Sequence, residues 1–268
     1  MTVAQDAFAG TRGTVVVHSW PNPSARYVAL IAHGYGEHAR RYDHVAERLV
    51  AHGAAVYAPD HHGHGLSDGE RALVDDLDKG VHDLHSVAER AEGEHPGLAA
   101  VLIGHSMGGL IATRYGQLFG RELAALVLSG PAVGGNPDLE GLAQLDPIPD
   151  VPIDPAVLSR DLAVGQAYAD DPLVYHGPFK RETLMGLSAA VAAVAEGGTF
   201  GALPTLWIHG EEDELVPLVY TRPAIDLVRG DSFEQKLYPG ARHEVFNETN
   251  GDEVIDDVLA FIDRALPS

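Results

Sequence analysis

The stretch Gly104-His105-Ser106-Met107-Gly108 places a serine hydroxyl between small neighbours in the pattern G-x-S-x-G. It directly follows a β-rich run at 100–103 and precedes a helical pattern at 107–119. A strand–turn–helix of this kind is the setting of a nucleophile elbow, a tight turn that presents a serine at the end of a strand. Glycines avoid the clashes that larger residues would cause there, and the helix N-terminus favours negative charge. The sequence therefore predicts that Ser106 is a nucleophile.

A serine nucleophile needs a base, and the base needs a carboxylate that orients it. His243 follows a predicted strand at 234–237, and four acidic residues at 211–214 follow another at 205–208. The carboxyl ends of parallel strands meet at one edge of a sheet, where Ser106 is also expected. Enzymes with a nucleophile elbow have the same order of serine, acid and histidine along the chain. Spacing alone does not choose among the four acids.

The oxyanion formed on an attacked carbonyl group needs two backbone N–H donors. One is expected from Met107, which follows the nucleophile. The other is expected from Tyr35 in His33-Gly34-Tyr35-Gly36, after a predicted strand at 27–31. The two glycines beside Tyr35 free the backbone to aim this N–H at the site.

Short β-rich runs alternate with amphipathic helical patterns along the chain. We predict strands at 15–17, 27–31, 55–57, 100–103, 125–128, 205–208 and 234–237, and helices at 40–52, 77–88, 107–119 and 254–266. Alternation of this kind implies βαβ units and an α/β fold, with a parallel sheet covered by helices on both faces.

The stretch 131–203 is too long for an ordinary crossover between two strands. We predict that it is an inserted cap over the carboxyl edge of a core formed by residues 1–130 and 204–268. The cap begins with a stretch rich in Pro and Asp and ends with a helical pattern at 183–195. Leu184, Met185, Leu187 and Val191 of that pattern either line an apolar pocket or pack the cap onto the core.

The composition excludes several classes of protein. The 268 residues include no cysteine, which rules out disulfides and thiolate chemistry. With 18 Lys and Arg against 39 Asp and Glu, the formal net charge is −21, and no basic cluster for nucleic acid is present. We find neither a secretory signal nor a transmembrane segment, so we expect a cytoplasmic protein. Peripheral membrane association through the cap and the oligomeric state stay open.

Six stretches carry a specific resemblance. They are His33-Gly34-Tyr35-Gly36-Glu37-His38, Arg41-Tyr42, the segment 60–71 (DHHGHGLSDGER), the elbow with Gly109, the segment 168–173 (YADDPL) and the loop 209–213. In these motifs the chain resembles bacterial monoacylglycerol lipases of the α/β-hydrolase superfamily. The resemblance implies the α/β-hydrolase fold, with a mostly parallel eight-stranded sheet, helices on both faces and an inserted cap.

The resemblance also implies an activity and a set of site residues. It implies hydrolysis of monoacylglycerols to glycerol and free fatty acid through an acyl-enzyme, without cofactor or metal. The orienting acid falls on Asp213, and Tyr35 and Met107 form the oxyanion hole. The residues implied to surround the glycerol end of the substrate are Glu37, Arg41, His105 and Tyr168.

Alternative interpretations remain. A lysophospholipase or a general carboxylesterase would have the same fold and triad. Gly34 to Ala39 also fits G-x-G-x-x-A after a strand, with Asp60 at the position of a ribose-binding acid, as in a dinucleotide-dependent oxidoreductase. Asp60, His61, His62 and His64 could be read as metal ligands, although a polar loop bent at Gly63 and Gly65 is preferred. A non-catalytic receptor would be expected to have a damaged triad, and all three residue types are present.

Overall fold

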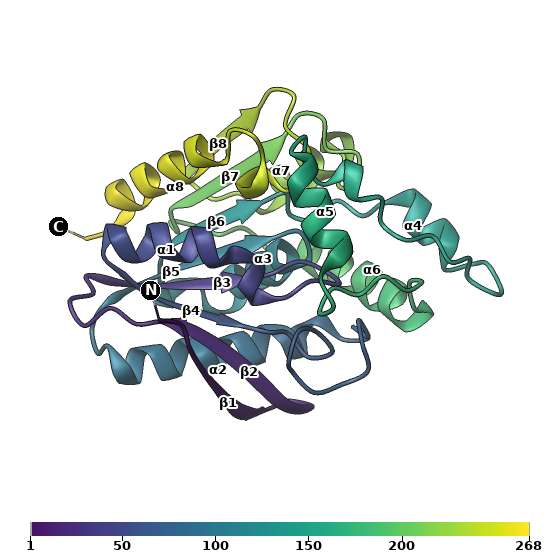
Figure 1. Ribbon diagram of the computed structural model, residues 1–268. Coiled ribbons are helices and arrows are strands. Elements are labelled where there is room, and N and C mark those ends of the chain that lie inside the picture. Colours follow the sequence, from purple (N-terminus) through teal and green to yellow (C-terminus); the bar gives the residue numbers. More distant parts are fainter. Residues whose placement is uncertain (1, 268) are drawn as a thin grey trace.

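The computed structural model describes residues 2–267, and its core is an eight-stranded sheet (Figure 1). In spatial order the strands are β1 (Ala4–Gly10), β2 (Gly13–Trp20), β4 (Ala54–Pro59), β3 (Tyr27–Ala32), β5 (Ala99–His105), β6 (Leu123–Ser129), β7 (Thr205–Gly210) and β8 (Phe233–Tyr238). β1 pairs antiparallel with β2, and β2 with β4, while all other pairs are parallel. The expected mostly parallel sheet is confirmed.

The strand β1 has no counterpart among the strands predicted from sequence. Most of its residues are exposed, so it lacks the apolar pattern by which a buried strand is recognised. It forms a hairpin with β2 that turns at Thr11 and Arg12, and Gly13 in this turn has a φ of 139°. The strand therefore depends on pairing with its neighbour rather than on burial of its own side chains.

Helices cover both faces of the sheet, as the strand periodicity requires. Alternate residues of β3 point to opposite sides, so that Leu30 packs with α2 (Leu77–Glu94) and α3 (Met107–Phe119), whereas Ile31 packs with α1 (Asp43–His52) and α8 (Gly251–Ala265). The predicted helix at 40–52 begins with the 3₁₀ turn η1 (Ala39–Tyr42) and ends at Gly53, which has a φ of 110°. The helix α7 (Leu218–Val228) was not predicted.

The segment between β6 and β7 contains α4 (Pro137–Leu142), η3 (Pro155–Val157), α5 (Leu162–Asp170) and α6 (Arg181–Glu196). The helix predicted at 183–195 is thus present as α6. Figure 1 shows α4, α5 and α6 grouped at one end of the sheet. The division of the chain into a core and a cap stays a prediction. Between residues 2 and 267, no helix has the length and apolar character needed to cross a bilayer.

Candidate active site

Ser106 lies in the turn between β5 and α3, with φ 55° and ψ −117°. This left-handed backbone is unusual for a residue other than glycine and holds strain at the turn. A Cβ atom on Gly108 would lie 2.1 Å from the carbonyl oxygen of Ala32, and one on Gly104 would lie 2.3 Å from that of Gly108. The backbone N–H of Ser106 donates to Ser129 O on β6 at 3.0 Å. The turn therefore has the geometry of a nucleophile elbow, and its glycines are required by close backbone contacts.

Asp213 and His243 are brought together although 30 residues separate them. The Nδ1 atom of His243 lies 2.8 Å from Asp213 Oδ2. The other carboxylate oxygen, Oδ1, accepts the backbone N–H groups of Leu215 at 3.0 Å and Val216 at 2.8 Å. Asp213 is buried, whereas the acids at 211, 212 and 214 are exposed. Burial thus selects Asp213 among the four acids.

The electrostatics of this pair favour a charged carboxylate and a basic imidazole. Burial raises the pKa of Asp213, but His243 and His209 outweigh burial and lower it well below its usual range. Burial lowers the pKa of His243, but Asp213, followed by Glu244 and Glu37, raises it above the ordinary value of 6.5. The imidazole is therefore a stronger base than a free histidine.

His209 supports Asp213 from behind and was not predicted as a site residue. The Trp207 Nε1–H donates to His209 Nδ1 at 3.1 Å. Because an indole nitrogen only donates, the remaining proton lies on His209 Nε2, which is 2.8 Å from Val216 O and 3.1 Å from Asp213 Oδ2. This chain of contacts holds the Asp213 loop against β7, and nothing in the spacing of these residues marked it in advance.

Ser106 and His243 line one hollow of about 620 Å³. Tyr35 and Met107 line it as well. The loop of Tyr35 lies against the elbow, because a Cβ atom on Gly34 would lie 3.2 Å from Ser106 Cβ. Among the turn, loop and cap hydrogen bonds of residues 2–267, none is donated by the backbone N–H of Tyr35 or by that of Met107. Both N–H groups are thus available beside Ser106.

A buried histidine fixes the loop that carries Tyr35. The His33 Nδ1–H donates to Gly34 O at 2.8 Å, and His33 Nε2 accepts the N–H of His61 at 3.0 Å. Burial, followed by the charges of His61 and His64, holds the pKa of His33 well below its ordinary value. A neutral His33 therefore joins the loop after β3 to the loop after β4.

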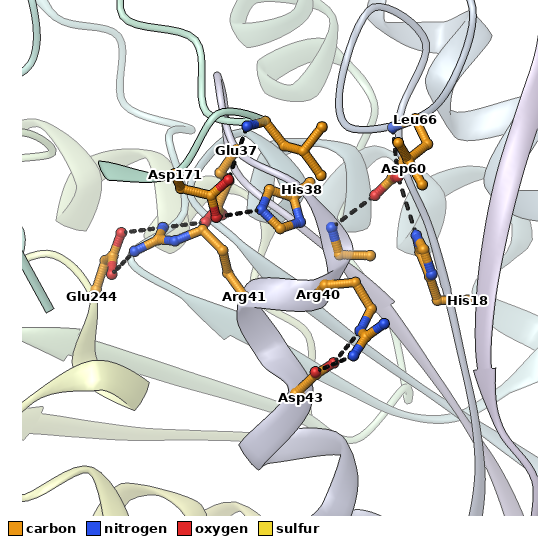
Figure 2. A network of polar contacts seen from close by, with 12 residues as sticks. His18, Glu37, His38, Arg40, Arg41, Asp43, Asp60, Leu66, Asp171 and Glu244 are labelled. Carbon is orange, nitrogen blue, oxygen red and sulfur yellow. Dashed lines mark hydrogen bonds and ion pairs between the residues drawn. The ribbon is translucent and has the colours of Figure 1, made fainter. Parts of the chain in front are cut away.

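Asp60 has a structural role in this second loop. The alternative interpretations had made it a ribose-binding acid or a metal ligand. Its Oδ1 accepts the N–H of Ala39 at 2.9 Å, and its Oδ2 accepts that of Leu66 at 2.8 Å and lies 3.1 Å from His18 Nε2 (Figure 2). The carboxylate is thereby committed to the protein and not presented to a ribose. Within residues 2–267, no three acidic, histidine or cysteine side chains are grouped as metal ligands.

The glycines of this loop behave as predicted. Gly63 and Gly65 have φ values of 77° and 49°, and a Cβ atom on Gly65 would lie 2.3 Å from the Asp60 carboxylate. Burial is the main cause that lowers the pKa of His61 to about 3 and that of His64 to about 4. Both imidazoles are therefore neutral near pH 7. The loop is a bent, polar support beside the elbow.

The four side chains expected at the glycerol end all line the same hollow as Ser106. Arg41 contacts Glu37, and its guanidinium lies 5.0 Å from the centre of the Tyr168 ring. The His105 ring lies 4.7 Å from that of His243, and its Nδ1 is 3.1 Å from Ser129 Oγ. Burial, followed by the charge of His243, lowers the pKa of His105 to about 4.

Glu244 also lines this end and was missed from the sequence. Its two carboxylate oxygens accept Arg41 Nη1 at 2.7 Å and Nη2 at 2.8 Å (Figure 2). Burial raises the pKa of Glu244, but Arg41 outweighs burial and lowers it. The only available signal was its position beside His243, which does not reveal a partner 203 residues away.

The rest of the hollow is apolar and adjoins a second hollow of about 540 Å³. Both are lined by Ala132, Leu139, Leu187, Leu215 and Val216. Leu184 and Val191 of α6 line the second hollow, which is one of the two roles expected for them. The prediction was wrong for Met185, which is 62% exposed because it lies on the solvent side of the helix. A long apolar group can thus extend from Ser106 beneath α4 and α6.

Comparisons with known proteins agree with this geometry. The family described as serine aminopeptidase S33 matches residues 23–250. The chain is 40% identical to a monoacylglycerol lipase of Mycolicibacterium smegmatis, with 97% of each chain covered. It is 31% identical to the human monoglyceride lipase, covering 85% of this chain and 78% of that protein. The solved structure of Paleococcus ferrophilus monoacylglycerol lipase superposes with a TM-score of 0.79 at 25% identity, covering 99% of this chain and 100% of the other.

The identity to curated relatives extends over nearly the whole chain, and the fold is shared from end to end. The resemblance inferred from the six motifs is confirmed. The chain belongs to the monoacylglycerol lipases, serine hydrolases of the α/β-hydrolase superfamily.

Proposed function

We propose that the protein hydrolyses monoacylglycerols to glycerol and free fatty acid, with Ser106, Asp213 and His243 as a catalytic triad. The observation that carries this proposal is a single hollow that has a polar and an apolar end and is lined by both Ser106 and His243, the latter in contact with the buried Asp213. A substrate with a small polar alcohol and a long apolar acyl chain matches both ends. The names of the relatives agree with this substrate.

The reaction proceeds by acyl transfer in two halves. Ser106 Oγ attacks the ester carbonyl carbon while His243 Nε2 takes the serine proton, and Asp213 stabilises the imidazolium. The N–H groups of Tyr35 and Met107 donate to the oxyanion; one such donor contributes about 2.7–4 kcal/mol in comparable enzymes. Collapse of the intermediate breaks the ester bond, and His243 returns the proton to the glycerol oxygen. Water then attacks the acyl-enzyme by the same route in reverse and releases the fatty acid.

The apolar end dominates affinity in this proposal. Burying ten methylene groups contributes about 8 kcal/mol, whereas each hydrogen bond to the glycerol end contributes about 0.5–1.5 kcal/mol. The acyl chain therefore supplies binding energy, and Glu37, Arg41, His105 and Tyr168 fix the orientation of the alcohol. Octanoyl to dodecanoyl esters should be turned over more efficiently than acetyl esters; equal efficiency would contradict this division of roles.

Residues 131–203 act as a cap in this scheme, because their Leu139 and Leu187 line the hollow together with Ser106. Transient contact of the cap with a lipid surface would bring the substrate to this hollow. Support comes from exposed apolar side chains on the segment, with Leu162 81% and Met185 62% accessible. Flotation with phosphatidylcholine vesicles tests the contact: the wild type should co-float more than the variant Leu162→Asp/Met185→Asp, and equal flotation would refute it.

The function is tested by labelling and by a substrate panel. A fluorophosphonate probe should label the wild type and fail to label Ser106→Ala. The panel compares octanoylglycerol with a diacylglycerol, a triacylglycerol, a lysophosphatidylcholine and an aminoacyl anilide. We expect the highest kcat/KM for octanoylglycerol. Labelling without turnover of octanoylglycerol would retain the serine hydrolase and reject the substrate, in favour of a lysophospholipase or general carboxylesterase if another ester is cleaved.

A further inference from the structure

Arg41 is held between two buried carboxylates at the polar end of the hollow (Figure 2). The exposed fractions of the side chains are 10% for Arg41, 4% for Glu37 and 5% for Glu244. Glu244 receives both terminal nitrogens of the guanidinium in the fork geometry, whereas Glu37 contacts only Nη1. Glu244 thus occupies the face of Arg41 that ordinarily binds a planar carboxylate or a phosphate.

The two carboxylates outnumber the single cation that they contact. When His243 is in its basic form, the lining residues with a formal charge are Glu37, Arg41 and Glu244. Their sum is one negative charge, placed where the alcohol part of an ester would lie. The neighbouring polar groups, Tyr168 and the neutral His105, do not offset it.

The cluster retains acceptors that suit hydroxyl groups. Glu37 Oε1 already receives Gly34 N at 2.5 Å and Tyr42 Oη at 2.7 Å. Among residues 2–267, Glu37 Oε2 and Glu244 Oε1 each receive a hydrogen bond from Arg41 alone. Since a carboxylate oxygen can accept two hydrogen bonds, each of these oxygens can accept one more, for example from a glycerol hydroxyl. An anionic group would meet like charge there, and the fork of Arg41 is filled.

We propose that Glu244 is a specificity-determining residue that makes this site select esters of neutral or cationic alcohols and reject esters whose alcohol carries a phosphate or carboxylate. The proposal rests on the proposed function. Without the charge of Glu244, the cluster becomes a neutral Glu37–Arg41 pair. The guanidinium of Arg41 is then free to bind an anionic head group. The residue therefore separates monoacylglycerols from their phosphorylated counterparts.

The test compares three octanoyl esters on one enzyme: 1-octanoylglycerol, 1-octanoylglycerol 3-phosphate and octanoylcholine. The acyl chain is constant, so differences in kcat/KM report the head group. Added salt of about 0.3 M screens long-range repulsion by the net charge of −21. For the wild type we expect the phosphate ester to be slower than octanoylglycerol by about a hundredfold or more, and octanoylcholine to be cleaved faster than the phosphate ester.

Glu244→Gln should lower the ratio of kcat/KM for octanoylglycerol over the phosphate ester by about tenfold or more. Glu248→Gln is the matched control. Glu248 is a buried carboxylate of the same loop that pairs with Arg160 at 2.9 Å and does not line the hollow, and its exchange changes the net charge equally. Its ratio should equal that of the wild type, whatever happens to the absolute rates.

Several results would overturn the proposal. An unchanged ratio in Glu244→Gln would do so, as would equal changes in both variants. If Glu244→Gln does not fold, the wild-type series decides: turnover of the phosphate ester within about fivefold of octanoylglycerol refutes the assignment. A wild type that cleaves none of the three esters contradicts the proposed function itself, which is a distinguishable failure.

Discussion

The exchange Asp213→Asn removes the charge of the proposed triad and can keep the backbone hydrogen bonds of the Asp213 loop. Asp213 Oδ1 accepts two backbone N–H groups at 3.0 and 2.8 Å, and an asparagine carbonyl can accept both. The change is concentrated at Oδ2, which lies 2.8 Å from His243 Nδ1 and 3.1 Å from His209 Nε2 and becomes an amide NH₂, while the His209 N–H keeps Val216 O as its acceptor at 2.8 Å. The loop should therefore fold, while the imidazole loses its anionic partner.

Two losses add in the transition state. When His243 becomes an imidazolium, its charge is centred about 4 Å from that of the carboxylate, an attraction of about 4 kcal/mol at an effective dielectric constant of 20. Loss of this attraction slows acylation about 10³-fold. The amide also donates to Nδ1, so the proton moves to Nε2 and the base faces away from Ser106. The corresponding exchange in a serine protease lowers kcat about 10⁴-fold, and we expect a loss of 10³- to 10⁴-fold here.

The assay is steady-state hydrolysis of octanoylglycerol at pH 8, together with thermal unfolding to establish that the variant is folded. Glu212→Gln is the control, because Glu212 is exposed in the same loop, and its activity should stay within about twofold of wild type. A folded Asp213→Asn variant with activity within about tenfold of wild type would refute the reasoning. A large loss of activity in Glu212→Gln would show that activity is sensitive to any change in this loop, and not specifically to the charge of Asp213.

Three further predictions follow from the same geometry. Because His243 has a raised pKa and acts as a base when neutral, kcat/KM should fall as the pH drops through a midpoint above 6.5. Glu244 contributes to the raised pKa, so Glu244→Gln should move that midpoint to lower pH. A pH–rate profile of this variant with an unmoved midpoint would contradict the reasoning. Leu187→Trp fills the junction of the two hollows and should reduce the preference for dodecanoyl over butanoyl glycerol by about tenfold in kcat/KM, with equal losses on both esters counting against it. Gly108→Ala places a Cβ atom 2.1 Å from Ala32 O and should lower the free energy of unfolding by about 1–3 kcal/mol in urea titrations; an unchanged midpoint would mean that the backbone yields easily.

The elbow and the parallel strands could be predicted because their causes are local. The glycines that permit the turn lie within two positions of Ser106, and the strands β3, β4 and β5 are buried runs of apolar residues. The order of serine, acid and histidine placed the site at one edge of the sheet. By contrast, β1 carries little apolar signal because it is an exposed edge strand whose partner determines it.

The sequence by itself determined the fold class, the position of the elbow and the family, because these depend on short motifs and on periodicity. The family resemblance had already indicated Asp213 among the neighbouring acids, but only the tertiary structure showed that it is buried beside His243, that His209 supports it, and that Glu244 fills the fork of Arg41. Burial and pairing depend on distances between atoms in space. Residues 203 positions apart can be in contact while adjacent acids face solvent, so no spacing along the chain encodes these pairs directly.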